Sequence, residues 1–387
     1  MRTVGRRGFL RGAVAGGGAV AFAGGLWQEA FAAPAQPGAG PYGPLGAVDA
    51  RGVQLPAGFT SRIVARSMQM VEGTSYRWHP APDGGACFPD GDGWIYSSNS
   101  EVPLVGGVSA LRFAADGTIT GAYRTLSLTQ LNCAGGATPW KTWLSCEEYD
   151  FGCVYETDPY GVKAAKPRPA MGRFKHEAAA CDPDHKVVYL TEDQPDGCFY
   201  RFTPKTWGDL SSGTLEVLVG TAPGPVGWKR VPNPEFWVTA TRDQVEGALR
   251  FKGGEGCYYA HGICYFTTKG DNRVWAYDAG ARTLDLAYDD DLVVGTPPLT
   301  GVDNITGTAG GDLYVAEDGG NMEINVITPE GVVTPFLRLA GQEKSEITGP
   351  AFSPDGRRLY FSSQRGTSGS LLGNDGLTYE VTGPFRA

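Results

Sequence analysis

Short hydrophobic runs recur along the chain, and each follows a turn that contains glycine, aspartate or lysine. Every run is three or four residues long and contains at least one aromatic residue. Runs of this kind, bounded by turn residues, predict β-strands. The pattern therefore predicts an all-β chain, with marker strands at residues 94–96, 142–144, 187–190, 263–266, 313–315 and 359–361.

One aromatic residue in each run marks a repeat. The six markers are Tyr96, Trp143, Tyr189, Tyr265, Tyr314 and Tyr360, and the intervals between them are 47, 46, 76, 49 and 46 residues. Four nearly equal intervals of this length are typical of propeller blades. We predict a six-bladed β-propeller with insertions, the longest near residues 222–237; an irregular β-sandwich is the alternative.

Composition agrees with this fold class. Glycine and proline make up 84 of 387 residues, about 22%, against a usual share of roughly 12%. So many helix breakers argue against a helical bundle. A hydrophobic content of 41% argues against disorder, because it is enough to build a core.

The N-terminus has the features of an export signal. Arg6 and Arg7 precede a glycine-rich apolar stretch, and a small-residue cleavage site follows near residue 32. This pattern predicts a twin-arginine signal over residues 1–33, so the protein would be exported through the twin-arginine machinery to the periplasm or the extracellular space. A membrane anchor is the alternative, but the stretch is shorter than the roughly 20 residues a span needs. Residues 34–55 are predicted to be a flexible lead-in and residues 56–387 a single propeller domain.

Charge narrows the possible ligands. The net charge of −9 disfavours nucleic acid and anionic lipid, which need basic patches. With four histidines and 42 acidic residues, a metal site is expected to be rich in oxygen ligands.

Polar residues recur at two equivalent positions in most of the predicted blades, one before and one after the marker aromatic. In a propeller, the start of each innermost strand and the end of the next strand lie at the same mouth of the channel. Cys87, Cys133, Glu177, Glu255, Asp303 and Thr348 precede the markers, and Asn99, Glu147-Glu148, Glu192-Asp193, Thr268, Glu317-Asp318 and Ser363 follow them. So many carboxylates around one mouth need a cation, and Ca²⁺ is the direct inference.

Eight cysteines in an exported protein permit disulfides, and 146/153, 181/198 and 257/264 are plausible local pairs. Cys133 begins a strand within Asn132-Cys133-Ala134-Gly135-Gly136. As a thiolate it could bind a softer metal such as iron; a buried or disulfide-bonded cysteine is the alternative.

The residues around Cys133 closely resemble a known family. The block Asn132 to Trp140, followed by Thr142 to Glu148, is similar to the central motif of the PhoX-type alkaline phosphatases. Shorter similar stretches cover most of the mature chain, at residues 172–177, 189–193, 251–256, 302–305, 317–319 and 348–356. The chain is short for this family, and Gln364-Arg365-Gly366 stands where many relatives have a Gln-His pair.

The resemblance implies an exported β-propeller that hydrolyses phosphate monoesters and holds ferric iron and calcium at the channel mouth. It implies that Cys133 is the iron-binding thiolate and that Glu177 and Glu255 bridge metals. The remaining candidate ligands are Glu147, Glu148, Glu192, Asp193, Asp303, Asn304, Glu317 and Asp318.

The resulting hypothesis is a monomeric phosphatase that acts on a small phosphate ester. Bound metals would hold the phosphate oxygens and activate a water or oxo group for attack. The candidate catalytic residues are Cys133, Glu177, Glu255 and Arg173; Arg173 would clamp the phosphate, and a surface ion pair is the other interpretation of Arg173 and Arg168. A calcium-dependent lactonase or esterase, and a non-catalytic calcium-binding propeller, are the rival functions.

Overall fold

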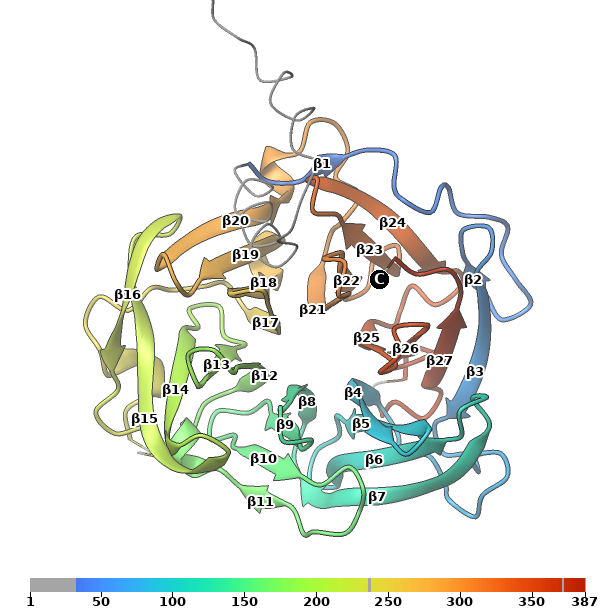
Figure 1. The fold of residues 1–387 in the computed structure, drawn as a ribbon, viewed down its shortest axis with the longest axis horizontal. Coiled ribbons are helices and arrows are strands. Elements are labelled where there is room, and N and C mark those ends of the chain that lie inside the picture. The colour runs from blue at the N-terminus through green and yellow to red at the C-terminus, as the bar shows by residue number, and fades with distance from the viewer. Residues whose placement is uncertain (1–32, 236–237, 371, 387) are drawn as a thin grey trace, which may run out of the picture.

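The six marker aromatics all lie on β-strands in the computed structural model, which describes residues 33–235, 238–370 and 372–386. Each marker is on the second strand from the centre of the molecule and is at most 2% exposed. The strands form sheets arranged around a centre, which gives an all-β, propeller-like architecture (Figure 1). The predicted export signal at residues 1–33 lies almost wholly outside the described residues.

Three sheets have four strands each. The first contains β4 (Pro82–Asp90), β5 (Gly93–Ser100), β6 (Gly106–Phe113) and β7 (Ile119–Thr129). The second contains β8 (Asn132–Ala137), β9 (Trp143–Glu147), β10 (Val154–Thr157) and β11 (Lys166–Pro167). The third contains β25 (Ile347–Phe352), β26 (Arg358–Ser363), β27 (Leu377–Thr382) and the early strand β3 (Thr60–Arg66). Pairing of β3 with β27 joins the two ends of the chain in one sheet.

A six-stranded sheet contains β21 (Val302–Gly307), β22 (Leu313–Glu317), β23 (Glu323–Ile327), β24 (Val332–Leu339), β1 (Gln36–Pro37) and β2 (Val53–Gln54). Both β1 and β2 come from the segment predicted to be a lead-in, residues 34–55. They pair with the outer strand β24, in parallel and antiparallel orientation respectively. The described part of this segment therefore extends the outer edge of a sheet.

A nine-stranded sheet accounts for the long interval in the repeat. Its strands are β12 (His176–Asp182), β13 (Val187–Glu192), β14 (Phe199–Thr206), β15 (Asp209–Gly220), β16 (Gly224–Arg230), β20 (Thr283–Asp289), β19 (Arg273–Asp278), β18 (Ile263–Thr268) and β17 (Gly254–Ala260). The extra strand β16 lies in the predicted insertion and pairs with both β15 and β20. Two predicted repeats are thereby merged, so the structure has five hydrogen-bonded sheets where six separate ones were expected.

Aromatic residues fill the spaces between neighbouring sheets and between the two merged repeats of the nine-stranded sheet. Tyr96 on β5 stacks on Tyr360 on β26, with ring centroids 5.0 Å apart. Phe199 on β14 stacks on Phe266 on β18 at 4.2 Å. Such pairs contribute about 0.5–1.5 kcal/mol beyond their buried area, so they hold the sheets in fixed positions around the centre.

Helical structure among the described residues is limited to single 3₁₀ turns: η2 (Pro169–Met171), η3 (Thr241–Asp243), η4 (Lys269–Asp271) and η5 (Asp290–Leu292). No helix in these parts of the chain has the length and hydrophobicity that a membrane span requires.

Candidate metal centre

The innermost strands β4, β8, β12, β17, β21 and β25 surround the centre of the molecule (Figure 1). Each of them has a register irregularity near its N-terminal end. A β-bulge of this kind changes the direction of a side chain, and bulges are common near active sites. The irregularities lie at residues 82–85, 132–135, 176–179, 254–257, 302–305 and 348–351.

Five of the bulges contain a residue that could bind a metal: Asp83, Cys133, Glu177, Glu255 and Asp303. The residue after each of the first four is glycine or alanine, because the strands approach one another closely below the mouth; Asn304 follows Asp303. A Cβ added to the glycine after Asp83 would lie 2.5 Å from the Cα of Ala134, and one added to the glycine after Glu255 would lie 2.6 Å from a backbone nitrogen of β21. This waist lines a small, partly open pocket of about 40 Å³.

Ligand atoms from these strands form four groups at the mouth. Within each group the atoms lie within 4.8 Å of one another, and successive groups share Cys133, Glu177 and Asp303. The result is one continuous arc of eight carboxylates and one thiol, which we call the acidic arc. Its four groups are Asp83–Glu101–Cys133, Cys133–Glu148–Glu177, Glu177–Glu255–Asp303 and Asp303–Asp318–Glu346.

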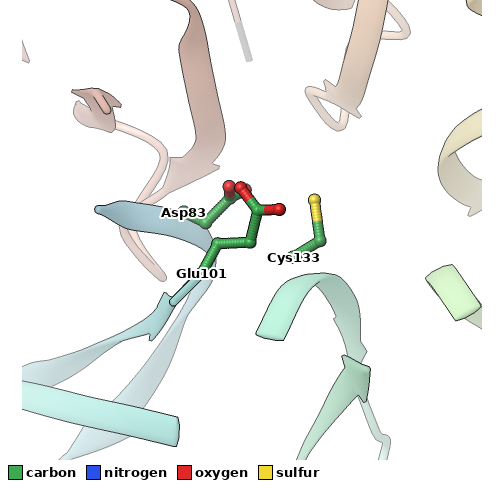
Figure 2. A group of neighbouring side chains, drawn as sticks. All are labelled: Asp83, Glu101 and Cys133. Atoms are coloured by element: carbon green, nitrogen blue, oxygen red, sulfur yellow. The ribbon is translucent and has the colours of Figure 1, made fainter. Parts of the chain in front are cut away.

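The thiol lies between carboxylates on both sides. Figure 2 shows the Asp83 and Glu101 carboxylates close together, with the sulfur of Cys133 beside them. On its other side, Cys133 Sγ donates to Glu177 Oε1 at 3.0 Å. The amide of Gln364 donates to both Asp83 Oδ2 and Glu101 Oε2 at 2.6 Å. The other oxygen of Glu177, Oε2, is buried and has no hydrogen-bond partner among the described residues.

Three cationic side chains pair with the acidic arc. Lys175 Nζ is 2.9 Å from Glu148, Lys269 Nζ is 2.9 Å from Glu255 and 3.4 Å from Asp318, and an Arg365 nitrogen is 3.1 Å from Glu346. Eight carboxylates and three cations leave a net charge of −5 if every acid is ionised, and four of the acids have no paired cation. Such a concentration of charge requires added cations or protons.

Burial and mutual repulsion raise the pKa values in the acidic arc. Burial, followed by the charge of Glu255, holds the pKa of Glu177 well above its usual range. Burial also raises the pKa of Asp303 to about 7, with the charges of Asp318 and Asp193 adding to the effect, and raises that of Glu148 to about 7. The Cys133 thiol likewise has a pKa well above its usual value, because of its burial and then the charge of Asp83. A bound cation would oppose each of these shifts.

These shifts predict that the metal-stripped protein loses stability as pH rises. An unfolded Asp or Glu ionises near pH 4, whereas folded Asp303 and Glu148 keep their protons up to about pH 7. The folded state therefore binds more protons between these values, and the free energy of unfolding falls with pH across this window. We expect a lower denaturation midpoint at pH 8 than at pH 5 after chelation, and a smaller difference after Ca²⁺ is restored. Greater stability at pH 8 in the metal-stripped protein would contradict this view.

Three predicted ligands face away from the acidic arc. Glu147, Glu192 and Glu317 point into their own sheets, where each carboxylate accepts the backbone N–H six residues later, at 3.0–3.2 Å. Glu147 also accepts from Gln130 N at 2.9 Å, and Glu317 from Thr300 N at 2.7 Å. The three glutamates thus fix the loop that follows each strand, and the structure does not bring them together with the other candidates.

Asp193, Asn304 and Arg173 lie outside the four groups. Asp193 Oδ1 would be 3.0 Å from a Cβ on Gly253, which places it at the edge of the mouth beside Glu255. Asn304 donates to Asp303 Oδ1 at 2.8 Å and accepts from a backbone N–H of β25 at 2.6 Å, so it positions an acid of the arc. Arg173 donates to the backbone carbonyl of Phe151 at 3.3 Å. From this segment it is Lys175, not Arg173, that pairs with an acid of the arc.

Arg168 forms an ion pair with Glu156 at 2.5 Å, but the pair is largely buried and not at the surface as one interpretation of the sequence had it: the side chains are 12% and 9% exposed. His176 is buried, donates from Nε2 to the backbone oxygen of Gly172 at 3.0 Å, and stacks on Phe174. Burial lowers the pKa of His176 to about 3, so it is neutral and structural. No histidine belongs to any ligand group found among the described residues.

Besides Arg365, which pairs with Glu346, sequence reasoning missed six residues that lie in or against the acidic arc. One signal was available for Asp83: the order Asp83-Gly84-Gly85 parallels Cys133-Ala134-Gly135. The repeat predicted Cys87 at this position instead of Asp83. Cys87 lies deeper and lines a cavity of about 320 Å³ below the waist. The missed residues are Asp83, Glu101, Lys175, Lys269, Glu346 and Gln364.

All eight cysteines are free thiols in the structure. Of the pairs that the sequence allowed, 257/264 brings its sulfur atoms to 3.5 Å, which is a contact and not the roughly 2 Å of a disulfide bond.

Solved structures share the fold at low sequence identity. A Bacteroides thetaiotaomicron protein of unknown function matches with a TM-score of 0.51 and 9% identity, covering 84% of this chain and 76% of its own. A gluconolactonase from Xanthomonas campestris has a TM-score of 0.49 and 14% identity, with 89% and 99% covered. These similarities concern the fold alone. The curated proteins contain no match to this chain.

A family model matches the middle of the chain. The model described as alkaline phosphatase PhoX matches residues 96–150 and 149–285. The matched region contains Glu101, Cys133, Glu148, Glu177 and Glu255 of the acidic arc. Of these, Cys133 and Glu177 each belong to two ligand groups. Residues 96–285 of the chain thus match the model of the PhoX alkaline phosphatase family.

Proposed function

We propose that the protein is an exported, metal-dependent hydrolase of phosphate monoesters that acts at the mouth of one β-propeller domain, residues 56–387. Six bulged innermost strands and six buried marker aromatics support six blades, with β16 linking two of them. The observation that carries the function is the acidic arc. It brings the ligands of the PhoX-matched region together around one thiol, although they are far apart in sequence.

The donor atoms fit the metals proposed, ferric iron and calcium. The groups that contain Cys133 combine a thiol with carboxylates, a set that suits iron, whereas the remaining groups offer only carboxylate oxygens, which suit Ca²⁺. The unpartnered Oε2 of Glu177 is a buried oxygen that a cation would satisfy.

When bound, the metals would act as Lewis acids toward phosphate and lower the pKa of water so that it attacks at near-neutral or alkaline pH. In this proposal Cys133 and Glu177 hold the middle of the metal centre, and Glu255 and Asp303 extend it. Lys175 and Arg365 take the clamping role first assigned to Arg173, because they are the partly exposed cations at the two sides of the mouth, 28% and 27% accessible. Their charge would attract an incoming phosphate group.

Phosphatase activity with elemental analysis tests this proposal. Protein exported in folded form should contain iron and calcium, hydrolyse p-nitrophenyl phosphate, and lose this activity after chelation. Cys133→Ala should lose iron and activity together. The proposal fails if no phosphate ester is cleaved and Cys133→Ala leaves the metal content unchanged. Calcium alone with lactone hydrolysis would indicate a lactonase, and calcium without hydrolysis a binding propeller.

A further inference from the structure

The second strand of each predicted blade ends at the mouth, and the ends are structurally equivalent. Each strand pairs with the start of an innermost strand through Ser100, Glu147, Glu192, Thr268, Glu317 or Ser363. The residues that follow these positions are Glu101, Glu148, Asp193, Lys269, Asp318 and Gln364. Four of the six are acids, so the lysine on β18 stands where most other strands present a carboxylate.

Lys269 contacts two acids of the arc. Its Nζ is 2.9 Å from Glu255 Oε1 and 3.4 Å from Asp318 Oδ2, which places the ammonium group between the third and fourth ligand groups. Glu255 is almost fully buried, whereas the Lys269 side chain is 37% exposed. The ammonium therefore supplies a fixed positive charge to an inner carboxylate from the solvent side.

The backbone holds Lys269 in this position. Its N–H donates to the carbonyl of Gly253 at 2.9 Å, and the N–H of Gly270 donates to the carbonyl of Lys252 at 2.8 Å. The hydroxyl of Thr268 donates to Asp271 across the same turn at 2.6 Å. The segment before Glu255 and the turn η4 are thus bound together.

Positive charge is unevenly distributed along the acidic arc. In the group Asp303–Asp318–Glu346, Lys269 pairs with Asp318 and Arg365 with Glu346. In the group Asp83–Glu101–Cys133, the contact comes from the neutral amide of Gln364. The Asp303–Asp318–Glu346 end of the arc is therefore partly neutralised by side chains, whereas the Asp83–Glu101–Cys133 end has carboxylates that only an added cation or proton would neutralise.

We infer that the ammonium group of Lys269 takes the place of a metal ion between Glu255 and Asp318, so that this chain binds fewer metal ions than its carboxylates would otherwise hold. The inference rests on the proposed metal-dependent function, which it makes more specific. It assigns the metals to the part of the arc around Cys133 and Glu177 and gives Asp318 an ion-pairing role.

Metal counting tests the role of Lys269 directly. The chelated protein is dialysed against Ca²⁺ alone, and bound calcium per chain is measured for the wild type, Lys269→Met and the control Lys205→Met, which removes an exposed lysine from β14. We expect one additional Ca²⁺ per chain in Lys269→Met and no change in Lys205→Met. An unchanged count in Lys269→Met overturns the inference.

A second pair of variants serves if Lys269→Met does not fold. In the wild-type background, Asp318→Asn should leave the metal count unchanged because Asp318 already has its cation, whereas Asp83→Asn should lose about one metal ion per chain. Loss of a metal ion in Asp318→Asn overturns the inference. The proposed function is judged separately, by the metal content and phosphatase activity of the wild type.

Discussion

Replacing Glu177 by glutamine should reduce phosphate monoester hydrolysis by at least about 1,000-fold, equivalent to about 4 kcal/mol of transition-state stabilisation. Glu177 belongs to two ligand groups, accepts from the Cys133 thiol, and has a buried oxygen that is left for a cation. An amide has only one acceptor oxygen and no charge, so one substitution weakens both groups at once. Steady-state kinetics and bound iron and calcium per chain, measured on the same preparations, would test this expectation.

Glu380→Gln is the matched control. Glu380 is also a buried glutamate, but it pairs with Arg62 and Arg358 and accepts from Tyr360, in the sheet that β3 and β27 share. We expect its substitution to lower stability while metal content and activity per folded molecule are retained. Normal metal content and activity in Glu177→Gln would show that the acidic arc is not the catalytic centre.

The phase of the repeat was predictable because the marker aromatics are buried in equivalent positions and fill equivalent spaces between sheets. The same phase selected Cys133, Glu177, Glu255 and Asp303, all of which lie at the bulges of innermost strands. The alanine or glycine that follows Cys133, Glu177 and Glu255 was a second signal, because the strands lie close together at the waist.

Counting residues back from the marker Tyr96 did not identify the candidate metal ligand of the first repeat. Cys87 and Asp83 are both on β4 and lie 9 and 13 residues before Tyr96, whereas the residues selected in the other repeats lie 10 to 12 residues before their markers. Simple spacing therefore could not decide between them. Glu346 was missed for a different reason: it precedes β25, outside the strand positions that the repeat identifies.

The adjacent acids Glu147-Glu148 and Glu317-Asp318 posed a different problem, because the two residues of each pair have different roles. Successive side chains of a strand point to opposite faces, so a one-residue difference decides whether a carboxylate reaches the mouth or the interior of its sheet. Glu148 and Asp318 join the acidic arc, whereas Glu147 and Glu317 accept backbone N–H groups from the following loops. The sequence shows both acids of each pair but not the face to which each belongs.

The adjacent pair Glu147 and Glu148 provides the sharpest test of this division. Glu147→Gln should lower the free energy of unfolding by about 1–3 kcal/mol, because one oxygen cannot accept the N–H groups of both Gln130 and Cys153 and a buried donor loses its partner. Metal content should stay at the wild-type value. Denaturant titration of the chelated protein and elemental analysis of the loaded protein measure the two effects separately.

Glu148→Gln should give the opposite result. Removing the carboxylate from the Cys133–Glu148–Glu177 group should lower metal affinity by at least about 10- to 100-fold, since even indirect partners of a metal have effects of this size. Its partly exposed ion pair with Lys175 contributes little to folding, and at pH 5 folded Glu148, whose pKa burial raises to about 7, keeps its proton. The stability of the chelated protein at pH 5 should therefore change by less than about 1 kcal/mol. If both variants lost metal equally, Glu147 would be a ligand and the two-sided arrangement would be wrong. Opposite results at neighbouring positions would separate metal binding from loop stabilisation, because both substitutions change the same chemical group.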